Sequence, residues 1–337
     1  MIYEVEKNYL TSYLRSFLSP IPKKLPLSFN DDYLMTLTSS GKAALHLILQ
    51  WLSSQKIFHD KTDSIVTPRW LGNWVYKTIQ QTAFPTDIVS NRSKAILVYH
   101  QYGFPQNMDE IMTEAKRKNL VVIEDCAHAL ESYYHNQRLG TIGEFGIFSF
   151  SKFFPLLMGG AILTKNKNAH IFFQEQLKKS RDRYRPFLTS SKFLANKYQT
   201  KQTTELLEMS YALYPYQTTI SHSAQKILTQ HLPDLEKRRL NYQTVKSILG
   251  NTACLPEHKD EVLPYVVPLF SSLNKLDKLV SLIRRSGFFS NIYHFDANRN
   301  IFNPNFLPVV WLPIHQGIKN QNLIHLCQAI KNILISK

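Results

Sequence analysis

Two short apolar segments on either side of an amphipathic one constrain the fold most. Residues 95–99 and 120–125 are almost entirely apolar up to their last positions, which is typical of strands buried on both faces of a sheet. Between them, residues 108–118 have the apolar spacing of an amphipathic helix. A strand, a helix and a second strand in this order form a parallel unit. We therefore expect an α/β fold with a mostly parallel sheet flanked by helices.

The flanking sequence extends this pattern. We expect a helix over 42–52 that is capped by Ser39 or Ser40, and further strands at 64–67, 146–150 and 160–164. The pattern from about 168 to 250 is largely helical. A strand at 265–270 and helices over 276–285 and 321–335 indicate a second unit. We expect a large domain over residues 1–239 and a small C-terminal α+β domain over 240–337.

The charge balance is strongly basic, with a formal net charge of +15 over 337 residues. This allows an anionic partner such as a nucleic acid, a membrane surface or a phosphorylated substrate. The basic residues are scattered, however, and the densest groups lie at 116–118, 178–185 and 237–239. Because none is a run of five or more like charges, we interpret the charge as a general surface property and expect no nucleic-acid partner.

Cysteine usage and the N-terminal segment indicate the compartment. The three cysteines include no CxxC pair, which suits a reducing compartment and argues against a structural zinc, so we expect no metal. Residues 1–7 carry acids and lack the apolar core of a signal peptide. No apolar stretch is long enough to span a membrane without charge. We therefore expect a cytoplasmic protein with no membrane partner.

Two glycine-containing segments could let the backbone approach a ligand closely. Ser40, Gly41 and Lys42 open the first expected helix, and the unpaired N–H groups and positive dipole of a helix N-terminus bind phosphate readily. The alternative is an ordinary capped helix start. Residues 159–160 are paired glycines, which allow a positive φ but are also common in plain turns.

The sequence positions of one carboxylate and one amine indicate a binding site. Asp125 ends a buried strand, at the sheet edge where ligands bind in parallel sheets, and could hold a cationic ring N–H. Its alternative role is an N-cap. Lys152 lies among aromatic residues, a setting that lowers the pKa of an amine and makes it a nucleophile for carbonyls, although a lysine at a strand edge can also reach into solvent. A phosphate site, a carboxylate and such a lysine are together what pyridoxal 5'-phosphate (PLP) requires.

Several motifs give the chain a resemblance to a known family. Residues 39–45 (SSGKAAL) are similar to the phosphate-binding S-G-T-A-A-L of the DegT/DnrJ/EryC1/StrS aminotransferases, which are fold-type I PLP enzymes. Residues 123–130 (IEDCAHAL) resemble the family's I-E-D-x-A-[QH]-A, and residues 100–105 (HQYGFP) its H-x-Y-G-x-P. Residues 139–144 and 312–315 resemble two further motifs. The resemblance runs from about residue 36 to 335.

The resemblance implies roles for individual residues. Lys152 would form the Schiff base with PLP and move the proton during turnover, while Asp125 would pair with the ring nitrogen. His128 would lie on the 3-hydroxyl side of the ring. Ser149 or Ser151 would hold the phosphate with the backbone of Gly41 and Lys42.

An aromatic residue should stack on the ring, and Trp70 and Trp74 are the candidates, with core packing as the alternative.

The implied activity is transfer of an amino group, from glutamate as the expected donor, to a nucleotide-linked keto sugar in surface polysaccharide or lipopolysaccharide synthesis. The cofactor would alternate between PLP and pyridoxamine 5'-phosphate, and the enzyme would be a homodimer. Arg181, Arg183 and Arg185 could meet substrate phosphates or form a solvated helix face.

The sequence also departs from the family. Residues 217–221 (QTTIS) lack the Asn and Arg of the family's N-x-R-M-S, and residues 157–160 (LMGG) replace its Gly-Glu-Gly-Gly. These departures favour an alternative, a catalytically altered or non-catalytic member with a binding or regulatory role. A PMP-dependent dehydratase is a second alternative, but those relatives lack the lysine, so Lys152 argues against it.

Overall fold

The computed structural model describes residues 32–180, 185–198, 200–213 and 219–335, with 2, 3, 5, 6, 9–17, 20, 22, 27 and 29. Its larger unit contains a seven-stranded sheet of order β1-β9-β8-β5-β4-β2-β3. These strands are β1 (Leu34–Thr38), β2 (Ser64–Val66), β3 (Phe84–Thr86), β4 (Ser93–Tyr99), β5 (Val121–Asp125), β8 (Phe145–Ser149) and β9 (Gly160–Thr164). Neighbours from β8 to β3 run parallel, whereas β9 is antiparallel to β8 and β1. The expected mostly parallel sheet is confirmed.

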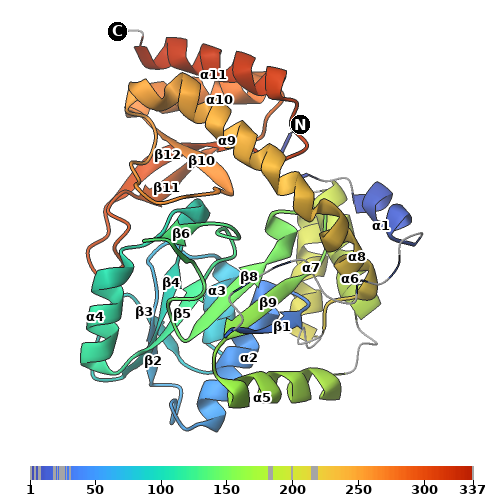
Figure 1. The fold of residues 1–337 in the computed structure, drawn as a ribbon, viewed down its shortest axis with the longest axis vertical. Coiled ribbons are helices and arrows are strands. Elements are labelled where there is room, and N and C mark those ends of the chain that lie inside the picture. The colour runs from blue at the N-terminus through green and yellow to red at the C-terminus, as the bar shows by residue number, and fades with distance from the viewer. Residues whose placement is uncertain are drawn as a thin grey trace.

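The helices are arranged around this sheet and a second, smaller unit (Figure 1). They are α1 (Tyr9–Phe17), α2 (Gly41–Ser54), α3 (Asn73–Ile79), α4 (Met108–Lys118), α5 (Lys167–Lys179), α6 (Arg185–Tyr198), α7 (Lys201–Leu213), α8 (His222–His231), α9 (Leu235–Leu249), α10 (Leu273–Arg285) and α11 (Asn320–Ile335). Helices α1, α6, α7 and α8 gather at one side of the large sheet. No described helix is both long enough and apolar enough to span a membrane.

Strand β4 shows why the sheet lies inside the protein. Ala95 and Leu97 pack into the cluster that α2 and α5 form on one face, whereas Ile96 and Val98 pack into the cluster of α4 on the other. Alternate residues of a strand point to opposite faces, so a strand covered on both sides must be apolar throughout. The continuous apolar run seen in the sequence is the consequence of this double burial.

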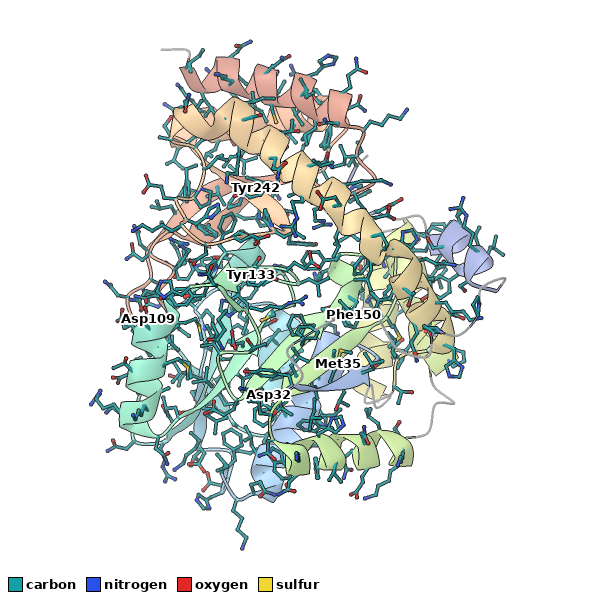
Figure 2. The ribbon with its side chains drawn as sticks, viewed as in Figure 1. Asp32, Met35, Asp109, Tyr133, Phe150 and Tyr242 are labelled. Carbon is teal, nitrogen blue, oxygen red and sulfur yellow. The ribbon has the colours of Figure 1, made fainter. Side chains whose placement is uncertain are left out.

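The smaller unit is a three-stranded antiparallel sheet of order β10-β12-β11. Its strands are β10 (Val266–Phe270), β11 (Ile292–Asp296) and β12 (Phe306–Pro313). Helices α9, α10 and α11 bury their apolar faces on it. Figure 2 marks the two units by Phe150, beyond the end of β8, and Tyr242, on α9. The domain boundary expected at residues 239–240 lies within α9, which runs alongside both units (Figure 1).

Candidate active site

The parallel strands β4, β5 and β8 end at one edge of the large sheet, and polar residues follow each of them. Tyr99 and Asp125 are directly opposite each other at the ends of β4 and β5. Ser149 ends β8, and Lys152 follows in the 3-10 turn Phe150–Lys152. In open α/β sheets, ligands bind in the crevice beyond the carboxyl ends of the strands. Asp125, Ser149 and Lys152, three of the residues predicted for a cofactor site, therefore lie at or just after the ends of strands that end at the same end of the sheet.

Asp125 is a buried carboxylate whose ionised form is disfavoured by its surroundings. Its side chain is 8% exposed, and Oδ1 accepts a hydrogen bond of 3.0 Å from the backbone N–H of Ala127. Burial raises the pKa of Asp125, while the hydrogen bond from Ala127 and the nearby His100 and Lys152 lower it. Since burial dominates, a cationic partner at this edge would stabilise the ionised carboxylate.

His128 is held by aromatic neighbours from both units. Its ring stacks on Tyr265 with a centroid distance of 4.1 Å, and its Nδ1 lies 2.7 Å from the Tyr99 hydroxyl oxygen. Burial, followed by the charges of Lys152 and Arg238, holds the pKa of His128 well below its usual value, and burial raises that of Tyr99. Both groups are therefore neutral at pH 7. We assign the hydroxyl as the donor to Nδ1, which leaves the ring proton on Nε2.

Lys152 lies beside the same residues. Its Nζ is 5.5 Å from the centroid of Tyr265, and its charge acts on both Asp125 and His128. The neighbouring side chains Phe150, Phe153 and Phe154 are fully buried. The structure thus brings together an amine, a carboxylate and an imidazole that are 27 residues or less apart in sequence.

The N-terminus of α2 meets the ends of β8 and β9. Ser40 is the N-cap, as expected, and its hydroxyl accepts a hydrogen bond of 3.2 Å from Ala43 N. A Cβ on Gly41 would lie 3.4 Å from Ser149 Cβ, so the two residues are in contact distance. Gly160 packs still closer, since its Cβ would lie 2.5 Å from the carbonyl carbon of Ser40. The predicted phosphate-site residues Ser40, Gly41 and Ser149 therefore surround one helix N-terminus.

Replacing Gly160 with alanine is expected to lower the free energy of unfolding by about 2 kcal/mol, because the new Cβ would press on backbone atoms that cannot give way. Gly250→Ala is the matched control. Gly250 has a helical φ of −55° and nothing within 4 Å of a new Cβ, so we expect no loss of stability. Urea unfolding of both variants measures the difference, and equal effects would contradict the close approach.

Of the two candidate tryptophans, Trp74 lies against Lys42 at this helix end. The Nζ of Lys42 is 4.3 Å from the ring centroid of Trp74, and burial, together with Lys192 and Lys152, lowers the pKa of Lys42 to about 6. Trp70 is 52% exposed and stacks on His294 of β11 with a centroid distance of 4.4 Å. A stacking role of Trp70 on a cofactor ring stays a prediction. Trp74 is the tryptophan that contacts a predicted site residue.

Arg238 corrects the interpretation of residues 237–239 as surface charge. Its side chain is fully buried, with Nη1 donating to the backbone oxygens of Pro264 (3.4 Å) and Tyr265 (3.1 Å). Its Nε donates to Gln316 Oε1 (3.3 Å), and Gln316 Nε2 donates to Phe153 O (2.7 Å). Arg238 therefore ties the residues beside Lys152 and His128 to the small unit. It shares the apolar stripe of α9 with Leu235, Tyr242, Val245 and Leu249, a spacing that could have revealed its burial.

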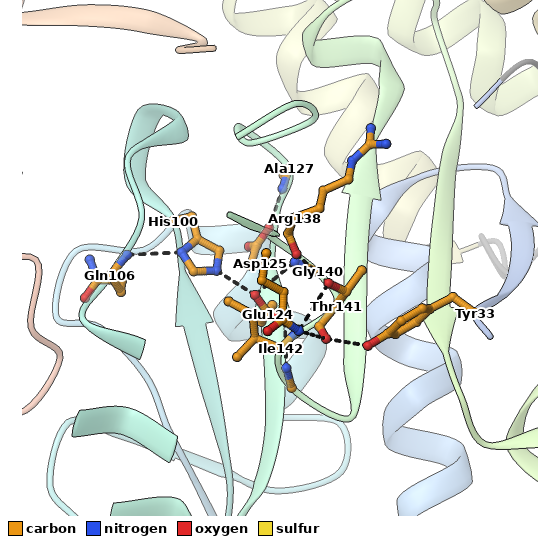
Figure 3. A network of polar contacts seen from close by, with 12 residues as sticks. Tyr33, His100, Gln106, Glu124, Asp125, Ala127, Arg138, Gly140, Thr141 and Ile142 are labelled. Atoms are coloured by element: carbon orange, nitrogen blue, oxygen red, sulfur yellow. Dashed lines mark hydrogen bonds and ion pairs between the residues drawn. The ribbon is translucent and has the colours of Figure 1, made fainter. Parts of the chain in front are cut away.

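A second buried network supports the loop after Asp125 (Figure 3). Glu124 Oε2 accepts from His100 Nε2 (3.0 Å) and Gly140 N (2.9 Å), and Oε1 accepts from Ile142 N and Gly143 N (2.7 Å each). His100 Nδ1 in turn accepts from Gln106 N at 3.2 Å. Both carboxylate oxygens are therefore occupied by donors.

Cys126 lies in the same cluster as His100 and Glu124, with ligand atoms within 4.8 Å of one another. Both oxygens of Glu124 and both ring nitrogens of His100 already take part in hydrogen bonds within the protein. We interpret this cluster as support for the loop that follows β5.

Glu124→Gln is expected to cost about 3 kcal/mol of unfolding free energy, because the amide turns an –NH₂ group toward backbone donors and leaves them unpaired. Glu114→Gln on α4 is the control, since its surface pair with Arg117 is screened by solvent and the substitution should leave stability nearly unchanged. Thermal or urea unfolding measures both. A Glu124 variant as stable as the Glu114 variant would show that the network contributes little.

Some of the predicted residues lie outside the part of the chain that the structure describes. Arg181 and Arg183 lie outside the described residues, as does the side chain of Arg185. In the segment 217–221, residues 217 and 218 also lie outside them. Ser151 is in the turn with Lys152 and is partly buried.

The large mixed sheet flanked by helices, with a small C-terminal sheet unit, is the fold-type I architecture of the aminotransferase structures that resemble this chain. The chain belongs to the DegT/DnrJ/EryC1/StrS aminotransferase family, whose family model matches residues 83–262. The resemblance seen in the sequence is thereby confirmed.

Individual relatives match over shorter segments. The GDP-perosamine synthase of Escherichia coli O157:H7 is 40% identical over 84 residues, which are 24% of this chain and 23% of that protein. The lipopolysaccharide biosynthesis protein RfbH of Salmonella typhimurium is 40% identical over 80 residues, 23% of this chain and 18% of that protein. The matched segments thus span less than a quarter of these two curated relatives.

Among solved structures, Helicobacter pylori PseC, an aminotransferase involved in the biosynthesis of pseudoaminic acid, superposes with a TM-score of 0.67. The superposition covers 98% of this chain and 96% of PseC at 13% sequence identity. It supports the fold along nearly the whole chain.

Proposed function

We propose that this protein is a PLP-dependent aminotransferase that transfers an amino group to a nucleotide-linked keto sugar. The convergence of Asp125, His128 and Lys152 beside the N-terminus of α2 carries the proposal. Bound PLP would supply a protonated ring that withdraws electrons and a carbonyl carbon that amines attack. The donor set fits this cofactor, since it offers a buried carboxylate, a neutral imidazole and a lysine in aromatic surroundings.

Each residue has a task that its surroundings support. Asp125 would hold a proton on the ring nitrogen, because a buried carboxylate gains most from a cationic partner. His128, with its proton on Nε2, would donate to the ring oxygen next to the carbonyl. Lys152 would bind the cofactor covalently through Nζ and then carry a proton between the two carbons that exchange it.

The substrate class rests on the family and on the relatives' names. GDP-perosamine synthase and RfbH point to nucleotide sugars and to lipopolysaccharide synthesis, and we propose the same pathway class for this chain. Glutamate is the proposed donor. We further propose that the protein is a homodimer and that it works in the cytoplasm. The three buried, unpaired cysteines support a reducing compartment such as the cytoplasm.

A half-reaction test does not require the acceptor to be known. Purified protein is loaded with PLP, and glutamate, glutamine and GDP-perosamine are added separately while the visible absorbance is followed. An amino donor should bleach the PLP band, and mass spectrometry should detect the keto product. A stable PLP band that no amino acid and no amino sugar bleaches would refute the aminotransferase and favour a non-catalytic member, which the sequence of residues 217–221 also suggests.

A further inference from the structure

Three lysine side chains from separate elements approach one another at the N-terminus of α2. Lys42 is the second residue of α2, Lys152 lies in the turn after β8, and Lys192 comes from α6. The charge of Lys152 acts on both of the other amines, and that of Lys192 acts on Lys42. Lys192 carried no signal in the sequence, because it lies in a helix without a recognisable motif.

Packing of α6 explains how Lys192 reaches this place. Leu188 of α6 is buried in one cluster with Ala43 of α2 and with Leu157 and Met158 of the segment that follows Lys152. The Thr189 hydroxyl also lies 3.4 Å from the sulfur of Met158. Lys192 comes one helical turn after Leu188 and hence projects from the same face of α6. The helix is therefore fixed with this lysine toward α2 and Lys152.

The electrostatics of the three amines favour an anion. Burial, and then the charge of Lys152, lowers the pKa of Lys192 to about 8, and the pKa of Lys42 is lowered further, to about 6. Within the described part of the chain, no carboxylate forms an ion pair with Lys192. The positive end of the α2 dipole adds to the same field. Amines gathered in this way take up protons and are stabilised as cations when a multiply charged anion binds between them.

We propose that the side chains of Lys192 and Lys42 bind the phosphate group of the cofactor at the N-terminus of α2. This inference rests on the proposed function and adds two cationic ligands from the same chain to the cradle of Gly41 and Ser149. The cofactor's phosphate is favoured over a substrate phosphate because Lys42 directly follows Gly41, and a Cβ on Gly41 would lie 3.4 Å from Ser149 Cβ at the end of β8. Lys152 lies three residues beyond Ser149, within one short turn.

The test compares PLP with pyridoxal, which has the same reactive ring but no phosphate. Affinities of both are measured by visible absorbance titration for wild type, Lys192→Met and Lys192→Arg. Methionine keeps an apolar stem of similar length for packing on α2, and arginine keeps the charge. Lys197→Met is the matched control, because Lys197 is on the same helix but exposed, with Nζ over the rings of Phe193 and Tyr198.

Lys192→Met is expected to weaken PLP binding by about tenfold to about a hundredfold, the effect of one lost charge-assisted hydrogen bond, and to change pyridoxal binding by less than about twofold. Lys192→Arg should restore most of the affinity, and Lys197→Met should behave as wild type. A parallel titration with GDP and UDP tests the other phosphate source.

Four results would overturn the inference. Equal weakening of PLP and pyridoxal would mean that Lys192 acts on Lys152 or on packing. Unchanged PLP affinity would mean that it has no role in binding, and weakened GDP or UDP binding alone would assign it to the substrate. In these three cases the proposed function still stands. A wild-type protein that binds no PLP would instead refute the proposed function and this inference together.

Discussion

Lys152→Ala is expected to remove both the visible PLP absorption band and the amino transfer. The band arises from the covalent bond between the cofactor and an amine, and Lys152 is the amine whose charge acts on both Asp125 and His128. Loss of the proton carrier alone lowers the rate by roughly 10²- to 10⁴-fold. Loss of the covalent bond adds to this effect, so we expect no activity above background.

Two other amines could react with the cofactor in place of Lys152. Lys42 and Lys192 lie close to Lys152, and their lowered pKa values of about 6 and about 8 make both of them nucleophilic near neutral pH. Borohydride reduction of the PLP-loaded wild type, followed by peptide mapping, identifies the residue that carries the cofactor. Modification of Lys42 or Lys192 in place of Lys152 would show that the site is assembled differently. Lys152→Ala should then keep its absorption band.

The sequence predicted the elements that follow strong local patterns. Strand β9 has the expected bounds, and Ser40 caps α2 as expected, because double burial and helix capping leave a clear mark on neighbouring residues. Asp125 could also be placed at the sheet edge from sequence, since it ends a continuous apolar run. The family motifs then supplied roles that periodicity alone does not give.

The residues that sequence reasoning missed come from distant segments. Tyr265 precedes β10 yet stacks on His128, and nothing in its neighbouring sequence indicates a partner 137 residues away. Lys192 reaches the site only because Leu188 packs on α2. Tyr99 is a different case, because the parallel register that pairs it with Asp125 follows from two strands that the sequence did predict. Tertiary packing thus determines the positions of Tyr265 and Lys192, whereas the position of Tyr99 could have been predicted from the strand register.

Asp125→Asn is expected to lower the rate of amino transfer by roughly 10²- to 10³-fold, the usual effect of removing one preorganised charge from a site. Asparagine has the same shape and can still accept the hydrogen bond from Ala127 N. The covalent bond of Lys152 with PLP should therefore form, and the visible band should remain. The measurement is the rate at which glutamate bleaches that band.

Stability separates this electrostatic role from a structural one. Burial raises the pKa of Asp125, so the stability associated with its neutral form is present below the ordinary carboxyl value of 3.8 and is lost as the pH rises through the raised pKa. In the cofactor-free protein, Asp125→Asn should consequently match or exceed the wild type in unfolding free energy at pH 7. That difference should vanish below pH 3.8. If the variant lost stability in parallel with activity, the main role of Asp125 would be to fix the loop after β5. It would then not be to stabilise the positive charge on a cofactor ring.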